Sequence, residues 1–147
     1  MTRCSGLSPW VVALGIGLSV VLIGSCLAGL LEDREDSMRS ISRAFRPLGE
    51  MAKKKRFDAA TVAANGKAIA EELKHFTTLF PAGSEQADHG AAPEIWSDRA
   101  DFEKAATDAI AAAGVLAQAG DATAFQNAVG GMDHACRACH RKYKIDH

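Results

Sequence analysis

Two cysteines and a histidine near the C-terminal end of the chain have the spacing of an attachment site. The sequence there reads Cys136-Arg137-Ala138-Cys139-His140, so two thiols are two residues apart and an imidazole follows directly. This C-x-x-C-H pattern is the attachment signature of a c-type haem. Positions i, i+3 and i+4 of a helix share one face, so both sulfurs can reach the vinyl groups of one haem edge while the imidazole meets the iron. We therefore predict one covalently bound haem c with its iron held by His140.

Other uses of the cysteine pair fit the sequence less well. A zinc site usually has four ligands, and only His134 or His147 would be at hand to complete this pair. A thioredoxin-like redox pair needs a βαβ context, which the sequence lacks. A disulfide across two residues of a helix would be strained.

The composition predicts that helices carry this site. The chain has 147 residues, and about 116 of them follow an N-terminal apolar segment, enough for one domain with one core. Alanine and other helix formers dominate this part, which favours an all-α domain. The net charge of −1 and the single basic run at residues 53–56 argue against a nucleic-acid partner.

The apolar segment predicts export of the domain. Residues 10–31 are 22 consecutive residues without a charged side chain. As a helix they would be roughly 33 Å long, enough to cross a bilayer core of ~30 Å. Arg3 precedes them, whereas Glu32 and Asp33 follow, which places the N-terminus in the cytoplasm and the rest of the chain outside.

Three interpretations of residues 1–31 compete. The segment could be an uncleaved membrane anchor, or a cleaved signal peptide, although a cut after Ala28 would leave Cys26 at the −3 position. Residues 22–26 also resemble a lipoprotein signal in which Cys26 carries the lipid. All three put residues 32–147 outside the cytoplasmic membrane, either anchored on its periplasmic side or soluble in the periplasm.

Apolar spacing divides residues 32–147 into four helices, with a long polar loop over residues 81–96. Pro47 should kink or disturb the last turns of the first helix. The alternation by three and four is typical of an antiparallel four-helix bundle. The helices are expected from about 31 to 51, from near Asp58 to a stop at Pro81 and Gly83, from a cap at Ser97 or Asp98 to a turn at Gly120-Asp121, and from about 122 to 144. Their inward positions are Arg34, Met38, Ile41, Phe45, Leu48, Val62, Gly66, Ile69, Leu73, Phe76, Phe80, Phe102, Ala105, Ala106, Ile110, Ala113, Leu116, Phe125, Val129, Met132, Cys136, Cys139, His140 and Tyr143.

A second iron ligand would have to come from a methionine of this domain. Met132 is on the same helix as His140 and cannot reach around the haem. Met51 lies beyond Pro47, where the direction of the helix is uncertain. Met38 lies on the inner face of the first helix and is the best candidate, although a methionine there could equally fill space in the core.

Several further motifs make the domain resemble the class II cytochromes c, the family of cytochrome c prime and its low-spin relatives. The resemblance covers nearly all of residues 34–144, and the haem motif near the C-terminal end distinguishes it from class I cytochromes. The motifs are Arg34-Glu35-x-x-Met38, Leu79-Phe80-Pro81-Ala82-Gly83, Pro93-Glu94-Ile95-Trp96-Ser97-Asp98 and Cys136-Arg137-Ala138-Cys139-His140.

The resemblance implies a role for several of these residues. Arg34 would lie over the haem, close to a propionate, where guanidinium and carboxylate make a charge-assisted pair. The alternative for Arg34 is a solvated charge just outside the membrane. Glu35 stands where the family often has glutamine, so a second carboxylate near the propionates has no clear purpose. Trp96 is expected to pack in the loop over the bundle.

The resemblance also implies two functions that differ at Met38. In low-spin members a methionine there binds iron, and His/Met ligation suits electron transfer. In high-spin members that position holds a residue that does not ligate, and the five-coordinate iron binds nitric oxide or carbon monoxide. We expect the first: a membrane-tethered carrier, not an enzyme, that exchanges electrons with partner proteins of a respiratory or photosynthetic chain. Many relatives are homodimers through their first two helices.

Overall fold

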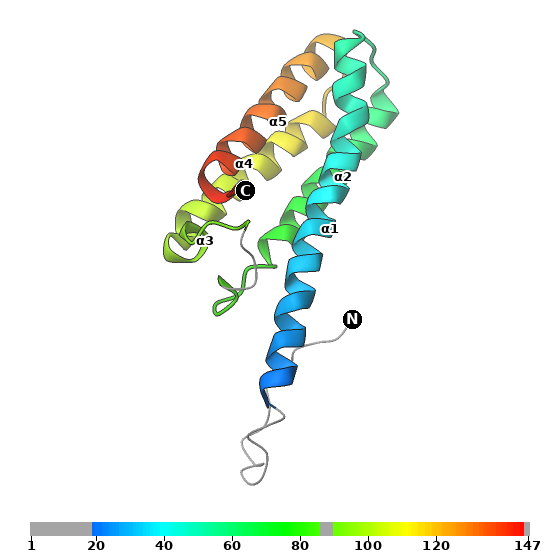
Figure 1. Ribbon diagram of the computed structural model, residues 1–147. Coiled ribbons are helices and arrows are strands. Elements are labelled where there is room, and N and C mark those ends of the chain that lie inside the picture. Colours follow the sequence, from blue (N-terminus) through cyan, green and yellow to red (C-terminus); the bar gives the residue numbers. More distant parts are fainter. Residues whose placement is uncertain (1–18, 86–89, 146–147) are drawn as a thin grey trace.

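The computed structural model describes residues 19–85 and 90–145, and of residues 19–28 it describes the backbone alone. This part of the chain forms five helices: α1 (Ser19–Lys53), α2 (Ala59–Thr77), α3 (Glu94–Ser97), α4 (Arg99–Ala117) and α5 (Ala122–Tyr143). The four long helices pack side by side, and the short α3 lies in the connection between α2 and α4 (Figure 1). The prediction of an all-α four-helix bundle is confirmed.

Aspartate side chains cap α2 and α5, at Asp58 as predicted and at Asp121, which is predicted only as a turn residue. The predicted cap at Ser97 or Asp98 is wrong in part: α4 begins after Asp98, but the Asp98 side chain makes no capping hydrogen bond and Ser97 belongs to α3. The Asp58 carboxylate accepts a hydrogen bond from the backbone N–H of Thr61 at 2.7 Å and caps α2. The Asp121 carboxylate accepts from the N–H groups of Thr123 and Ala124 at 2.9 and 2.8 Å and caps α5. Each cap satisfies N–H groups that the first turn of a helix leaves without a partner.

The first helix is longer than the apolar spacing predicts. It continues through Pro47 to Lys53, so the proline does not end it. Pro47 is exposed, and water can therefore hydrogen-bond the carbonyl oxygen that the missing N–H leaves open. At its other end α1 includes residues 19–31 of the predicted export segment, whereas residues 10–18 lie outside the described part of the chain. Within residues 19–85 and 90–145, no helix combines the length and apolar composition that a membrane span requires.

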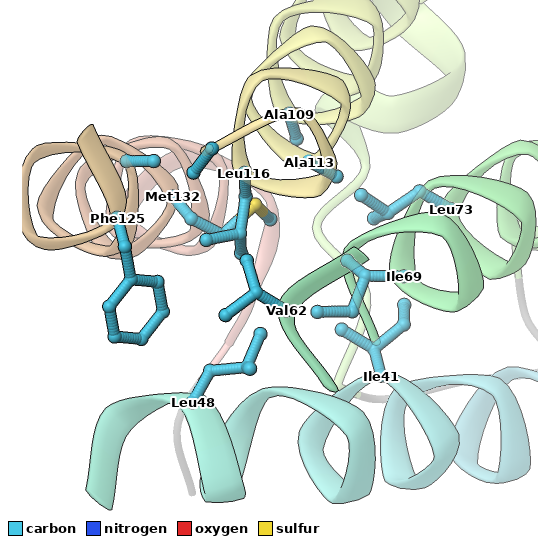
Figure 2. Close-up of a cluster of buried hydrophobic side chains, with 12 residues drawn as sticks. Ile41, Leu48, Val62, Ile69, Leu73, Ala109, Ala113, Leu116, Phe125 and Met132 are labelled. Atoms are coloured by element: carbon cyan, nitrogen blue, oxygen red, sulfur yellow. The ribbon is translucent and has the colours of Figure 1, made fainter. Parts of the chain in front are cut away.

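The core lies where the four long helices meet, and Figure 2 shows its side chains converging from all four. Most of the predicted inward positions are buried. Phe45, Phe76, Cys136 and Cys139 are only partly buried and His140 is exposed, because they line a pocket described below. Ala105, Ile110 and Val129 are also only partly buried. The fully or nearly fully buried side chains of this core include Leu48, Val62, Ile69, Ala113, Leu116, Phe125 and Met132.

Gly66 allows α2 and α4 to approach closely. A Cβ atom at this position would lie 2.6 Å from the backbone nitrogen of Ala117 and 2.7 Å from its Cα atom. Backbone atoms cannot rotate away as a flexible side chain can, so any side chain here would force the two helices apart.

We expect Gly66→Ala to lower the free energy of unfolding by about 1–3 kcal/mol, the usual cost of overpacking a well-packed core. Urea denaturation of the haem-loaded protein measures this change. Gly49→Ala is the matched control, because a Cβ atom there meets nothing within 4 Å and helix propensity alone should make that variant neutral or slightly stabilised. Equal stability of the two variants would contradict the close approach.

Candidate haem site

A pocket of about 660 Å³ opens between α1 and α5 at the end of the bundle where α5 ends. This volume is within the usual range for cofactor sites, roughly 300–1,000 Å³. Its wall is mostly apolar. The contributors are Leu31, Arg34, Glu35, Met38, Ile41, Ser42 and Phe45 of α1, Leu73 and Phe76 of α2, Phe102, Ala106 and Ala109 of α4, Met132, Asp133, Cys136, Arg137, Cys139, His140 and Tyr143 of α5, and Phe80, Gly90, Ala91, Ile95, Lys144 and Ile145 between and after the long helices.

The pocket brings together the three residues of the attachment motif. Cys136, Cys139 and His140 all line it from the last turns of α5. The two cysteines are half-buried and are not joined in a disulfide. Burial raises the pKa of the Cys136 thiol and raises that of Cys139 to about 11. Both therefore stay protonated at neutral pH, as S–H groups that can add to a vinyl group.

These residues fit a haem c and do not fit zinc. Two free thiols and an imidazole stand on one wall of a largely apolar pocket, which is the donor set for two thioether bonds and one axial ligand. Within residues 19–85 and 90–145, no group of three or more His, Cys, Asp and Glu side chains could hold a metal ion. His147, one of the two residues proposed for a zinc site, lies outside the described residues.

Arg34 also lines the pocket, but its guanidinium is buried and bound to the protein. Nε donates to the carbonyl oxygen of Leu79 at 3.0 Å, and Nη2 donates to Ser84 Oγ at 2.7 Å. The guanidinium carbon lies 4.3 Å from the ring centre of Phe80 and 5.4 Å from that of Trp96. The interpretation of Arg34 as a solvated charge is wrong, since its exposed fraction is 3%. Its predicted contact with a propionate stays a prediction.

Replacing Arg34 by methionine should lower the free energy of unfolding by about 1.5–3 kcal/mol, because hydrogen bonds from a charged donor to buried acceptors are lost. Arg34→Lys should recover little of this loss, since an ammonium cannot reproduce the planar fork. Chemical denaturation of the haem-loaded protein gives both values. Arg46→Met changes an exposed arginine of the same helix and should stay within about 0.5 kcal/mol of the native protein; an equal loss there would argue against the buried contacts.

Comparison with known proteins assigns the family. Residues 30–144 match the family model described as Cytochrome C'. The chain belongs to the cytochrome c' family. It is 31% identical over 135 residues to cytochrome c' of Rhodopseudomonas palustris, covering 85% of this chain and 90% of that one. It is 39% identical over 125 residues to cytochrome c-556 of Agrobacterium fabrum, covering 80% and 82%.

A solved structure of the cytochrome c' family shares the fold. The nitric oxide complex of a mutant of cytochrome c prime from Alcaligenes xylosoxidans superimposes with a TM-score of 0.76 at 25% identity, covering 82% of this chain and 97% of that one. Membership in the cytochrome c' family confirms the predicted cofactor, one covalent haem c with its iron. The attachment through Cys136 and Cys139 and the iron ligands stay predictions for this member.

Met38 lines the pocket from α1 as predicted, whereas Glu35 and Trp96 have partners of their own in this cytochrome c'. Glu35 is exposed at the rim of the pocket, and its carboxylate is 3.1 Å from Arg39 Nη1, so an ion pair on α1 accounts for its charge. Trp96 donates from Nε1 to the carbonyl oxygen of Pro81 at 3.1 Å and packs edge-on against Phe80. The expectation that Trp96 packs in this loop agrees with these contacts.

The last turn of α5 is tied to the bundle by contacts that the sequence does not predict. Tyr143 donates its hydroxyl hydrogen to the Asp101 carboxylate, and Lys142 Nζ lies 2.6 Å from the same oxygen. The hydrogen bonds from Lys142 and Tyr143 lower the pKa of the Asp101 carboxyl group. The pKa of Tyr143 is raised, mainly by burial and secondly by its hydrogen bond to Asp101. The backbone N–H of Ala92 also donates to the Tyr143 carbonyl at 3.0 Å. These ties hold the turn that carries His140, the predicted iron ligand.

Proposed function

We propose that this chain binds a small diatomic gas, nitric oxide or carbon monoxide, at a single haem c whose iron is held by His140. When bound, the haem would supply an iron able to take up such a gas. The observation that supports the proposal is the composition of the pocket wall opposite α5, which α1 and α2 form. Among the described residues that line the pocket from α1 and α2 there is no histidine or cysteine that could bind the iron opposite His140. Met38 is the one methionine among them. A related protein, cytochrome c prime from Alcaligenes xylosoxidans, is known as a nitric oxide complex of a mutant.

A second candidate function is electron transfer, and the position of Met38 favours it. Met38 is partly buried and lines the pocket from α1, whereas His140 lines it from α5. Two helices would thus present a thioether and an imidazole to one pocket, and a His/Met pair raises the reduction potential and suits an electron carrier. In that case the chain transforms no substrate and exchanges single electrons with partner proteins.

The visible spectrum of both oxidation states separates the two functions. A high-spin spectrum that changes on adding carbon monoxide to the reduced protein is the result expected for the gas-binding function. Low-spin bands with a sulfur-to-iron charge-transfer feature, unchanged by carbon monoxide, would reject that function in favour of the electron carrier. Haem that is absent after purification from a host able to mature c-type cytochromes would reject both.

We further propose that the domain works outside the cytoplasm and is held at the membrane by residues 10–31. Thioether attachment of haem takes place outside the cytoplasm, and the uncharged stretch of 22 residues is long enough to anchor the chain. Membrane fractionation of the native chain and of Cys26→Ser tests this placement, because only a lipoprotein would be released by the substitution. The homodimer implied by the family resemblance is tested by light scattering of the detergent-solubilised protein.

A further inference from the structure

The end of the uncharged segment and the edge of the haem pocket are the same place in the structure. Leu31 is the last residue of the uncharged stretch, and among the described side chains of α1 (residues 29–53) it is the first that lines the pocket. The helix is unbroken from Ser19 to Lys53. Figure 1 shows its N-terminal turns projecting beyond the ends of the other helices.

The helix is fastened to the bundle immediately after this point. Arg34 binds the carbonyl oxygen of Leu79 and the hydroxyl of Ser84, and its exposed fraction is 3%. One turn later the hydroxyl of Ser37, equally buried, donates to the Glu72 carboxylate of α2 at 2.7 Å. Because buried hydrogen bonds begin three residues after Leu31, there is no flexible linker between the projecting turns and the bundle.

We propose that residues 19–31 form a rigid stalk that holds the mouth of the haem pocket at the surface of a lipid bilayer. The proposal rests on the membrane attachment proposed above and adds the orientation of the pocket. We infer that the projecting turns contact lipid, because residues 19–31 carry no charged side chain. Glu32 and Asp33 follow directly and are exposed. The change from uncharged to charged residues, between Leu31 and Glu32, therefore lies at the edge of the pocket.

Helix geometry gives the distance of the pocket from the lipid. Met38 is seven residues beyond Leu31, which is about 10 Å along a helix. The polar layer on each side of a bilayer is roughly 5–8 Å thick. The haem pocket would thus lie next to the lipid headgroups, within reach of a partner that is in or on the membrane. The stalk would keep such a partner at high local concentration.

Energy transfer from a fluorescent phosphatidylethanolamine to the haem tests the stalk. The full haem-loaded chain is reconstituted into vesicles of phosphatidylcholine and phosphatidylglycerol that contain the labelled lipid. Seven alanines inserted between Asp33 and Arg34 add about two helical turns, which raises the pocket by about 10 Å and nearly keeps the helix face. A rigid stalk predicts that this insertion reduces the transfer at least twofold.

The control is a seven-residue Gly/Ser insertion after Gly120, an exposed turn position between α4 and α5. It should leave the transfer unchanged. Equal transfer in the native chain and the alanine insertion would overturn the stalk while leaving the attachment intact. A native chain that does not sediment with the vesicles would overturn the attachment itself, and the spectrum of the soluble protein reports haem function separately in either case.

Discussion

Replacing Cys136 and Cys139 together by alanine is expected to give a chain from which acidic acetone extracts all of the haem. In the native protein both thiols line the pocket and are free to form thioethers, so the pigment should remain with the denatured polypeptide. Without them only His140 coordination and packing hold the group, and neither survives unfolding. Extraction of protein matured in a competent host, followed by measurement of the colour in each phase, gives the result directly.

A matched pair of substitutions makes this test specific. Cys4→Ser combined with Cys26→Ser removes the other two cysteines of the chain and should leave all of the pigment on the protein. Each single substitution of Cys136 or Cys139 should leave one thioether and therefore resist extraction. Pigment that stays bound in the double alanine variant would refute attachment at this motif.

Met38→Ala is expected to raise the association rate of carbon monoxide by at least about tenfold, which corresponds to about 1.4 kcal/mol of activation free energy. The native side chain occupies the pocket wall on α1, and truncation to Cβ opens the space that an incoming gas needs. The spectrum should stay high-spin. Flash photolysis of the reduced protein measures the rate, and visible absorption gives the spin state.

Met51→Ala separates a pocket effect from a packing effect. Met51 is also a partly buried methionine of α1 that packs against the same core, but it does not line the pocket. Both variants should lose stability, whereas only Met38→Ala should change gas binding. A native protein that is low-spin and turns high-spin on Met38→Ala would contradict the gas-binding function and assign Met38 as an iron ligand.

The parts of the structure that the sequence predicts well are those with local causes. Asp58 and Asp121 cap helices by bonding N–H groups two or three residues away, so the cap and the helix start can be recognised together. The spacing of Cys136, Cys139 and His140 places them on one helix face, and all three line the pocket from α5. The inward positions follow from helical periodicity, and most of them are buried.

The parts that escape prediction depend on distant partners. Arg34 bonds residues 45 and 50 positions away, and a charged residue next to a predicted membrane segment gives no sign that it will be buried. The four residues of α3 are too few to show a period, so apolar spacing predicts a loop without a helix over residues 81–96. Pro47 was expected to disturb α1, but its effect depends on whether that side of the helix faces water.

The walls of the pocket come from helices that are far apart along the chain, and this separation bears on the order of events during maturation. Met38 and Cys136 are roughly a hundred residues apart, so bringing α1 against α5 requires closing a long loop. Contacts of such high sequence separation form slowly. If haem is attached at Cys136 and Cys139, we therefore expect the thiols of α5 to be accessible to the attachment apparatus while the chain is still open, and the later closure of α1 to shield the finished bonds from solvent.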